Sequence, residues 1–349
     1  MFSKEDIEQI KIMAESLEIK LIAETYNVPQ DVIKDVLRGD ITAENNTTKT
    51  STDFETKIKV VEKARFVRNK TVMAISPGGG MGKTTVLTSL AMASAIHIPN
   101  GRPIGIVDLA EYPKVITALG LETDDSIINT AGSILFGDGN GKDYTSSKIQ
   151  HPALDNLHVI PGVITTDNHL EITSEKMADI IIQFQNQCEI TFVDLPASLI
   201  KTGELLLHGD IILITLTPDY GSLVGFIQLL PTLKRLGLTN RSFIVLNRIG
   251  YPGLLEAKHF RKALTAKIND YYSVSDNSQF EFLGFLPETQ DLLKQINGEK
   301  ENIILSNSKS DFTGEVKYIL SKLCPDWQIK TEENSSGIAG ILGRLFKQG

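Results

Sequence analysis

The glycine-rich segment SPGGGMGKTT, residues 76–85, constrains the fold of this chain more than any other feature. The apolar, β-branched run TVMAIS before it predicts a strand, and KTTVLTSLAMASAIHI at its end predicts a helix. Glycines let successive backbone N–H groups curl around an anion without a Cβ atom in the way. The start of a helix adds partial positive charge at the same place. The segment therefore predicts a strand–loop–helix unit that binds a phosphate group.

Short apolar runs and helical patterns alternate along the chain after this unit. Such alternation is typical of an α/β fold, in which a doubly wound, mostly parallel sheet carries helices on both faces. The predicted strands are TVMAIS, PIGIVDLA, LHVIPG, ITFVDLP, DIILITLTP, SFIVLNRIG and FEFLGFLP.

The loop has most of the residues that a nucleotide-binding loop needs. Lys83 would reach the β- and γ-phosphates, and Thr84 would ligate Mg²⁺. The strict pattern G-x-x-x-x-G-K-[ST] is not met, because Pro77 stands where the first glycine belongs. The expected nucleotide-binding residues of the loop are Gly78, Gly79, Gly80, Met81, Gly82, Lys83, Thr84 and Thr85.

These motifs and their order resemble the deviant-Walker P-loop ATPases of the MinD/ParA class, whose loop reads roughly KGGxGKT. The likeness runs from Thr71 to about Cys324. IGIVDLAEYP, residues 104–113, resembles the family's second acidic motif, and ITFVDLPAS, residues 190–198, resembles its Walker B strand.

The resemblance implies a set of site residues, with ATP and Mg²⁺ as cofactors and a nucleotide-dependent homodimer. Asn247, Arg248 and Pro287 would contact the nucleotide. Thr84, Asp108 and Asp194 would lie at the metal, and Lys83 and Asp108 would be catalytic.

Two departures from the family pattern predict slow ATP hydrolysis. The signature lysine position is Gly78, and the second aspartate of the acidic motif is Ala110, after the retained Asp108. Phosphoryl transfer depends on positioned charge and a positioned water. Glu111 offers a replacement, but a shift of one residue at a strand end points a side chain to the opposite face. Such degraded loops are a feature of the CpaE/TadZ pilus-assembly localisation proteins, which this chain resembles most within the class.

The N-terminal residues 1–43 predict a small all-α, helix-turn-helix-like domain, with a polar and then basic linker over residues 44–68. LIAETYNVPQDVIKDVLRG, residues 21–39, carries the helix-turn-helix pattern. Residues 1–45 hold five Lys/Arg and ten Asp/Glu, and an acidic surface repels the phosphates that supply most DNA affinity. A protein partner is therefore favoured for this domain, and DNA binding stays open but disfavoured.

The C-terminal segment predicts a membrane-surface helix. The ATPase domain is expected over residues 69–325, a linker over 326–337 and an amphipathic helix over 338–349. Cations beside an apolar face are typical of helices that lie in a membrane interface, although such a helix could also dock on the ATPase core. The apolar face comprises Ile338, Ile341, Leu342, Leu345 and Phe346, and the cations are Arg344 and Lys347.

The composition is that of an ordinary globular protein, with 41% hydrophobic residues and a net charge of −8, which argues against a chain coated for nucleic acid. The two cysteines lie in no metal or redox spacing, which indicates a reducing compartment. We therefore expect a cytoplasmic protein, peripheral on the inner face of the cytoplasmic membrane, that positions a pilus or secretion machine there. The alternative is a ParA-like ATPase that segregates DNA or plasmids through the N-terminal domain.

Overall fold

The computed structural model divides the chain into two compact units, residues 1–67 and residues 68–349. In the second unit it describes residues 69–121, 143–145, 148–162, 172–196, 203–272, 280–297 and 301–330. In the first unit it describes residues 28–39 and scattered positions from 7 to 26.

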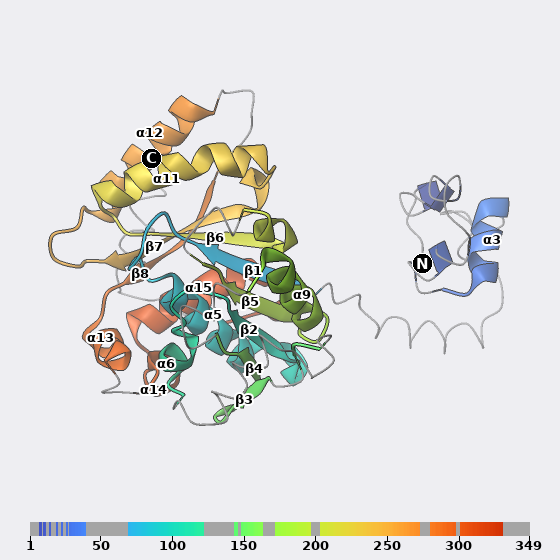
Figure 1. Cartoon of the computed structure of the whole chain (residues 1–349), viewed down its shortest axis with the longest axis horizontal. Helices are drawn as coiled ribbons and strands as arrows, with labels where there is room; N and C mark the ends of the chain where they lie inside the picture. Colours follow the sequence, from blue (N-terminus) through green and yellow to red (C-terminus); the bar gives the residue numbers. More distant parts are fainter. Residues whose placement is uncertain are drawn as a thin grey trace. The chain divides into compact units, whose positions relative to one another are not determined.

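The second unit is built on an eight-stranded sheet in the order β3-β4-β2-β5-β1-β6-β7-β8. All neighbouring strands run parallel except β3 and β4, which are antiparallel (Figure 1). The strands are β1 (Lys70–Ile75), β2 (Ile104–Asp108), β3 (Ile149–His151), β4 (Leu154–Ile160), β5 (Ile190–Asp194), β6 (Ile211–Leu216), β7 (Ser242–Ile249) and β8 (Glu281–Pro287).

Helices cover both faces of the sheet, each face with its own hydrophobic core. Side chains alternate between the faces along a strand: Val72 and Ala74 of β1 belong to one core, and Met73 and Ile75 to the other. Helices α9 (Ser174–Gln185), α11 (Tyr220–Arg235) and α12 (Ala257–Tyr271) pack on the Met73 side. On the Val72 side lie α5 (Lys83–His97), α6 (Val115–Leu119), α13 (Gln290–Ile296), α14 (Ile303–Ser306) and α15 (Asp311–Leu323). Short 3-10 turns are η1 (Pro99–Gly101), η2 (Leu205–His208), η3 (Thr239–Arg241) and η5 (Pro325–Trp327).

The structure confirms the predicted mostly parallel α/β sheet, and each of the seven predicted runs overlaps a strand. The eighth strand, β3, escaped the sequence analysis because three residues, IQH, are too few to show an alternating pattern. The predicted domain end at residue 325 falls within η5. Beyond it, Trp327 and Ile329 pack against the hydrophobic core on the α5 side of the sheet. The predicted membrane segment, residues 338–349, lies outside the described residues.

In the first unit, the described residues include helix α3 (Gln30–Arg38) and part of a small apolar cluster. The helix follows Pro29 and ends at Gly39, which adopts the left-handed conformation (φ 81°) that favours glycine. Ile10, Ile22 and Ile33 are fully buried in the cluster. Many residues before residue 28 lie outside the described part of the chain, so the helix-turn-helix arrangement stays a prediction. Within the described part of the chain, no helix is both long and apolar enough to cross a membrane.

Candidate functional site

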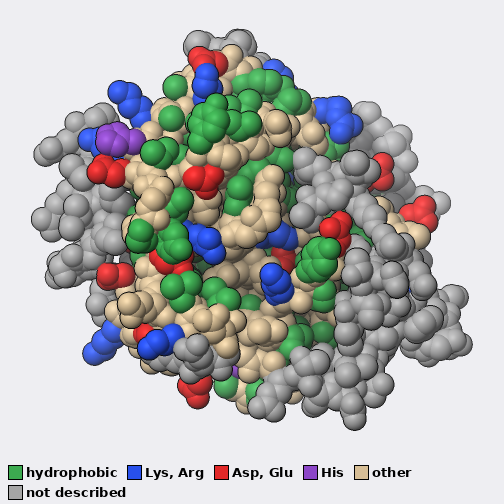
Figure 2. All heavy atoms as spheres, turned by 60° about the vertical axis from the view of Figure 1, so that its left-hand side comes forward, with side chains coloured by type: hydrophobic (Ala, Val, Ile, Leu, Met, Phe, Trp, Pro, Cys, Tyr) green, Lys and Arg blue, Asp and Glu red, His purple; other side chains and the backbone are tan. Residues whose placement is uncertain are grey.

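The candidate site lies at the carboxyl edge of the sheet, where the loops after β1, β2, β5, β6 and β7 meet. Parallel α/β sheets place their ligand sites at this edge, because all the parallel strands end there. Figure 2, which turns this side of Figure 1 toward the viewer, shows a hollow face where acidic and basic side chains meet beside apolar ones. The exposed Tyr112, Tyr220 and Leu255 belong to the segments that follow β2, β6 and β7.

The phosphate loop, residues 76–85, joins β1 to α5 as the sequence predicts. Two of its glycines have left-handed backbones, Gly80 at φ 77° and Gly82 at φ 86°. At Gly82 a side chain has no room either, because an added Cβ would lie 2.0 Å from Asn247 Nδ2. Gly82 immediately precedes the first helical residue, so its conformation aims the start of α5 into the loop.

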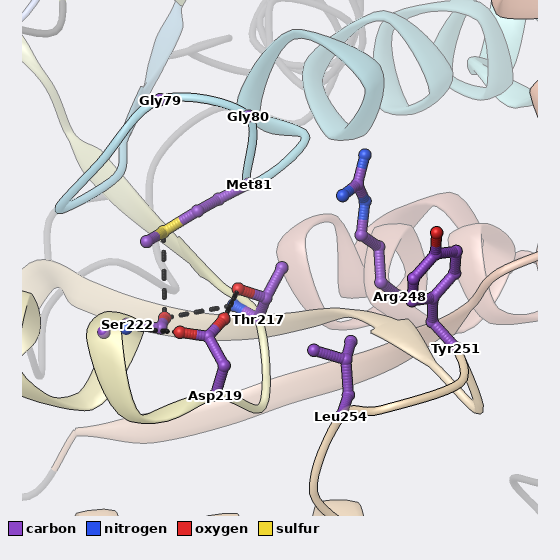
Figure 3. A pocket seen from close by; sticks show the side chains of 10 residues that line it. Gly79, Gly80, Met81, Thr217, Asp219, Ser222, Arg248, Tyr251 and Leu254 are labelled. Atoms are coloured by element: carbon purple, nitrogen blue, oxygen red, sulfur yellow. Dashed lines mark hydrogen bonds between the residues drawn. The ribbon is translucent and has the colours of Figure 1, made fainter.

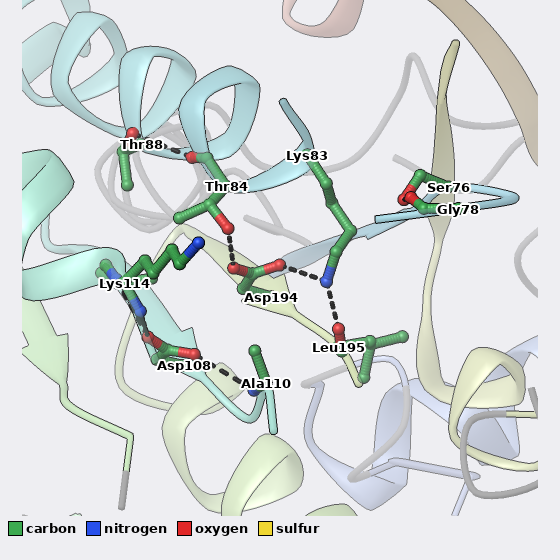
Figure 4. Close-up of polar contacts among 11 residues, drawn as sticks. Ser76, Gly78, Lys83, Thr84, Thr88, Asp108, Ala110, Lys114, Asp194 and Leu195 are labelled. Atoms are coloured by element: carbon green, nitrogen blue, oxygen red, sulfur yellow. Dashed lines mark hydrogen bonds and ion pairs between the residues drawn. The ribbon is translucent and has the colours of Figure 1, made fainter. Parts of the chain in front are cut away.

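Lys83, Thr84 and Asp194 meet directly below the loop (Figure 4). Lys83 Nζ lies 2.6 Å from Asp194 Oδ1 and also donates to the backbone oxygen of Leu195. Thr84 Oγ1 donates to Asp194 Oδ2 at 2.5 Å. Asp194 is fully buried at the end of β5, and a buried carboxylate is costly unless it is paired. The lysine and the hydroxyl balance its charge. The structure thus brings together three of the four residues predicted for phosphate and metal, the fourth being Asp108.

Asp108, at the end of β2, lies beside Asp194 in the register of the sheet but is held differently. One of its oxygens accepts the N–H of Ala110 at 3.1 Å, and the other accepts the N–H groups of Lys114 and Val115 at 2.9 Å each. Burial is the larger cause that raises the pKa of Asp108 to about 7, and the nearby Asp194 carboxylate is the second. In this structure Asp108 thus orders the turn that leads into α6.

Asn247 and Arg248, at the end of β7, stand on the other side of the loop. Asn247 is buried, and its Nδ2 donates to the Met81 backbone oxygen at 3.0 Å. Its Oδ1 is also buried and has no hydrogen-bond partner among the described residues. Arg248 has a left-handed backbone (φ 60°) and pairs with Glu288 at 3.5 Å. The predicted Pro287 is buried at the end of β8, opposite Ile249 of β7.

A pocket of about 350 Å³ opens between the loop and the segments after β6 and β7 (Figure 3). Met81 and Arg248, both predicted as site residues, line it together with Gly79 and Gly80. The sequence did not point to the remaining lining residues, most of which lie at the end of the predicted strand DIILITLTP or just after it. Those residues are Thr217, Asp219, Gly221, Ser222, Tyr251 and Leu254. Asp219 accepts the N–H of Ser222 at 2.8 Å and so caps α11, a pattern that an Asp before a helix can reveal in the sequence.

The other residues predicted for the nucleotide site lie in the phosphate loop or at the start of the helix that follows it. Gly78 and Gly79 complete the phosphate loop, and Thr85 stands in the first turn of α5. Across the residues that the structure describes, no cluster of three or more His, Cys, Asp or Glu side chains could hold a metal ion by itself. A metal at this site would therefore depend on Thr84 and Asp194, with further oxygen ligands from a bound phosphate.

Comparison of the sequence with known families identifies its class. A family model described as an AAA domain matches residues 69–245, just over half of the chain. The chain therefore belongs to this AAA-domain family. No curated protein matches it.

Solved structures show the same fold. The cell division ATPase MinD of Pyrococcus furiosus matches with a TM-score of 0.59 and 20% identity, over 73% of this chain and 98% of that one. The septum site-determining protein MinD of Pyrococcus horikoshii, complexed with Mg-ADP, matches with a TM-score of 0.59 and 18% identity, over 75% and 99%. A ParA family ATPase from Chlorobium tepidum matches with a TM-score of 0.55 and 20% identity, over 73% and 98%. The second unit thus has the MinD/ParA ATPase fold.

Proposed function

We propose that this protein binds ATP with Mg²⁺ and uses the bound state to position a membrane-associated machine, in the manner of CpaE/TadZ proteins that place pilus or secretion assemblies. The observation that supports nucleotide binding is the contact of Lys83 and Thr84 with Asp194, directly below a loop with two left-handed glycines. A lysine, a hydroxyl and a carboxylate in this arrangement match what a phosphate–Mg²⁺ group requires.

The residues of the site fit two parts of one nucleotide, its phosphates with Mg²⁺ and its base. Lys83 would hold the phosphates, and Thr84 and Asp194 would supply hard oxygen ligands to Mg²⁺. Mg²⁺ would supply charge neutralisation on the phosphate oxygens. Beyond the loop, the unpaired Oδ1 of Asn247 is a buried acceptor that an amino group of a purine base would satisfy. The MinD of Pyrococcus horikoshii, which has the same fold, was solved with Mg-ADP.

Hydrolysis is proposed to be slow or dependent on a partner. The methyl group of Ala110 cannot orient a water, and Gly78 offers no cation to the phosphates. Asp108 is occupied by three backbone N–H groups. The chain's own residues therefore bind and orient the nucleotide but provide little to accelerate its cleavage.

Membrane residence is proposed to depend on a nucleotide-dependent homodimer. One short helix over residues 338–349 would bind a bilayer weakly, because its apolar face is small. Two copies joined in a dimer would bind far better through effective concentration. The protein would then act on the inner face of the cytoplasmic membrane, with residues 1–43 free to bind a protein partner.

Vesicle flotation tests this proposal. The full chain and a version ending at Ser336 are floated with anionic vesicles, with and without ATP–Mg²⁺, next to the Lys83→Ala variant of the full chain. We expect flotation that needs both the tail and ATP and is lost in Lys83→Ala. Flotation that ignores ATP would overturn the nucleotide switch and leave a static anchor. Absence of flotation, with salt-sensitive retention on DNA instead, would favour DNA segregation.

A further inference from the structure

Pro77 in the phosphate loop rests on helix α11 at a position where only glycine fits. A Cβ atom added at Gly225 would lie 2.6 Å from Pro77 Cβ and 3.5 Å from the Pro77 backbone oxygen. The first of these distances is far shorter than a van der Waals contact, so the missing side chain at Gly225 is what allows the proline to approach. Pro77 is also the residue that replaces the first glycine of the nucleotide-loop pattern.

A second contact joins the same loop to the same face of α11. The Ser222 hydroxyl donates to Met81 Sδ at 3.7 Å (Figure 3) and accepts the N–H of Thr217 at 3.1 Å. Ser222 is fully buried, and it lies three residues before Gly225, which places both on one side of the helix. Two points of the loop, Pro77 and Met81, therefore contact one stripe of α11.

The missing lysine at position 78 is related to this contact. A Cβ atom at Gly78 would lie 3.2 Å from Met81 Cε, tighter than an ordinary contact. The bare backbone at Gly78 thus leaves room for the Met81 side chain on its way to Ser222. The proline, which departs from the strict nucleotide-loop pattern, and the absent lysine at position 78 both accompany the packing of the loop on α11.

From these contacts we infer that Gly225 and Ser222 are positioning residues, which hold the phosphate loop in its nucleotide-binding shape through Pro77 and Met81. A proline has a fixed φ angle and loses less conformational freedom on folding than a glycine. Seated on α11, it keeps the loop formed before any ligand arrives. This inference rests on the proposed function, because its effect is read as nucleotide affinity.

The variant Gly225→Ala tests the inference in the full-length protein. Its methyl group would displace Pro77 by about 1 Å to reach normal contact distance. We expect the affinity for a fluorescent ATP analogue with Mg²⁺ to fall at least tenfold. Gly314→Ala is the matched control, since Gly314 also lies in a helix and an added Cβ there meets nothing within 4 Å. Its affinity should equal that of the unmodified protein.

The second-site variant Pro77→Gly separates positioning from a general effect on stability. Without the ring of Pro77 there is nothing for the new methyl group to displace, so Gly225→Ala combined with Pro77→Gly should bind as well as Pro77→Gly alone. Failure of this rescue would overturn the inference. So would an unchanged affinity in Gly225→Ala while Lys83→Ala abolishes binding, a result that leaves the proposed function intact. If Lys83→Ala also binds normally, the proposed function itself fails.

Ser222→Ala gives an independent readout should Gly225→Ala fail to fold. It deletes the hydroxyl that donates to Met81 and accepts the N–H of Thr217. We expect the bound nucleotide analogue to dissociate several-fold faster. An unchanged dissociation rate would overturn the inference for this contact.

Discussion

Lys83→Ala should destabilise the nucleotide-free protein as well as abolish ATP binding. In the structure the Lys83 ammonium is the cation paired with Asp194, at 2.6 Å, and the aspartate side chain is fully buried. The variant would leave that carboxylate without its counter-charge, next to Asp108 on the neighbouring strand. A loss of ATP binding in Lys83→Ala would therefore have two causes, which must be separated.

The magnitude follows from burial. Removing one partner of a buried ion pair costs about 3–5 kcal/mol, because the other charge stays desolvated and unpaired. For a unit of this size, 1 kcal/mol corresponds to about 2–4 °C in melting temperature. We therefore expect Lys83→Ala to melt about 10 °C lower than the unmodified protein. Adding Asp194→Asn removes the stranded charge and should recover more than half of the loss.

Thermal unfolding and urea titration of nucleotide-free protein measure this difference. Lys267→Ala is the control, because Lys267 pairs with Asp270 at 3.5 Å while both side chains are more than half exposed. An exposed pair of this kind contributes close to nothing. If Lys83→Ala is as stable as this control, or if Asp194→Asn recovers nothing, the buried pair does not have the role assigned to it here.

Two further predictions concern the loop and its pH dependence. Gly82→Ala should weaken ATP binding about 100-fold, because it forces a left-handed alanine and displaces Asn247 from Met81, about 3 kcal/mol together. When Asn247 is first replaced by alanine, Gly82→Ala costs only the strained backbone, so the further loss of ATP affinity should shrink to about tenfold. Fluorescence titrations measure the affinity loss caused by Gly82→Ala with and without Asn247→Ala. Equal losses in the two cases would contradict the steric argument. Folding raises the pKa of Asp108 from 3.8 to about 7, so the folded state binds its proton more tightly and this stabilisation is lost as the pH rises from about 4 to about 7. Asp108→Asn has no carboxyl proton to titrate, so the stability advantage of the unmodified protein over this variant should fall between about pH 4 and about pH 7 in urea titrations; a constant difference would show that Asp108 does not titrate there.

The sequence predicted the parts of this fold that depend on local pattern. Apolar runs of six to nine residues and a glycine-rich turn before a helical pattern were sufficient to predict seven strands and the loop. Lys83 and Thr84 were identifiable for the same reason, since their role depends on spacing within one strand–loop–helix unit. Asp194 was assigned by resemblance, and parallel pairing of β1 with β5 then places it at the loop.

The rest of the site depends on contacts between segments far apart in the chain. Pro77 packs on Gly225, which lies 148 positions further along the chain. From the sequence alone, Pro77 is recognisable only as a turn residue and Gly225 only as a helix residue. The same holds for Asn247, which reaches the Met81 backbone across the sheet edge. No local pattern records which helix will lie behind a loop.

By itself, therefore, the sequence determined the α/β class, the position of the phosphate loop and the lysine and threonine that it presents. Periodicity and spacing are properties of short segments, and they survive without knowledge of the fold. The tertiary structure decided that Lys83 is held by a buried Asp194, that Asp108 caps the turn before α6, and that α11 supports the loop. These facts follow from strand order and helix packing, which bring distant residues together only when the whole sheet has formed.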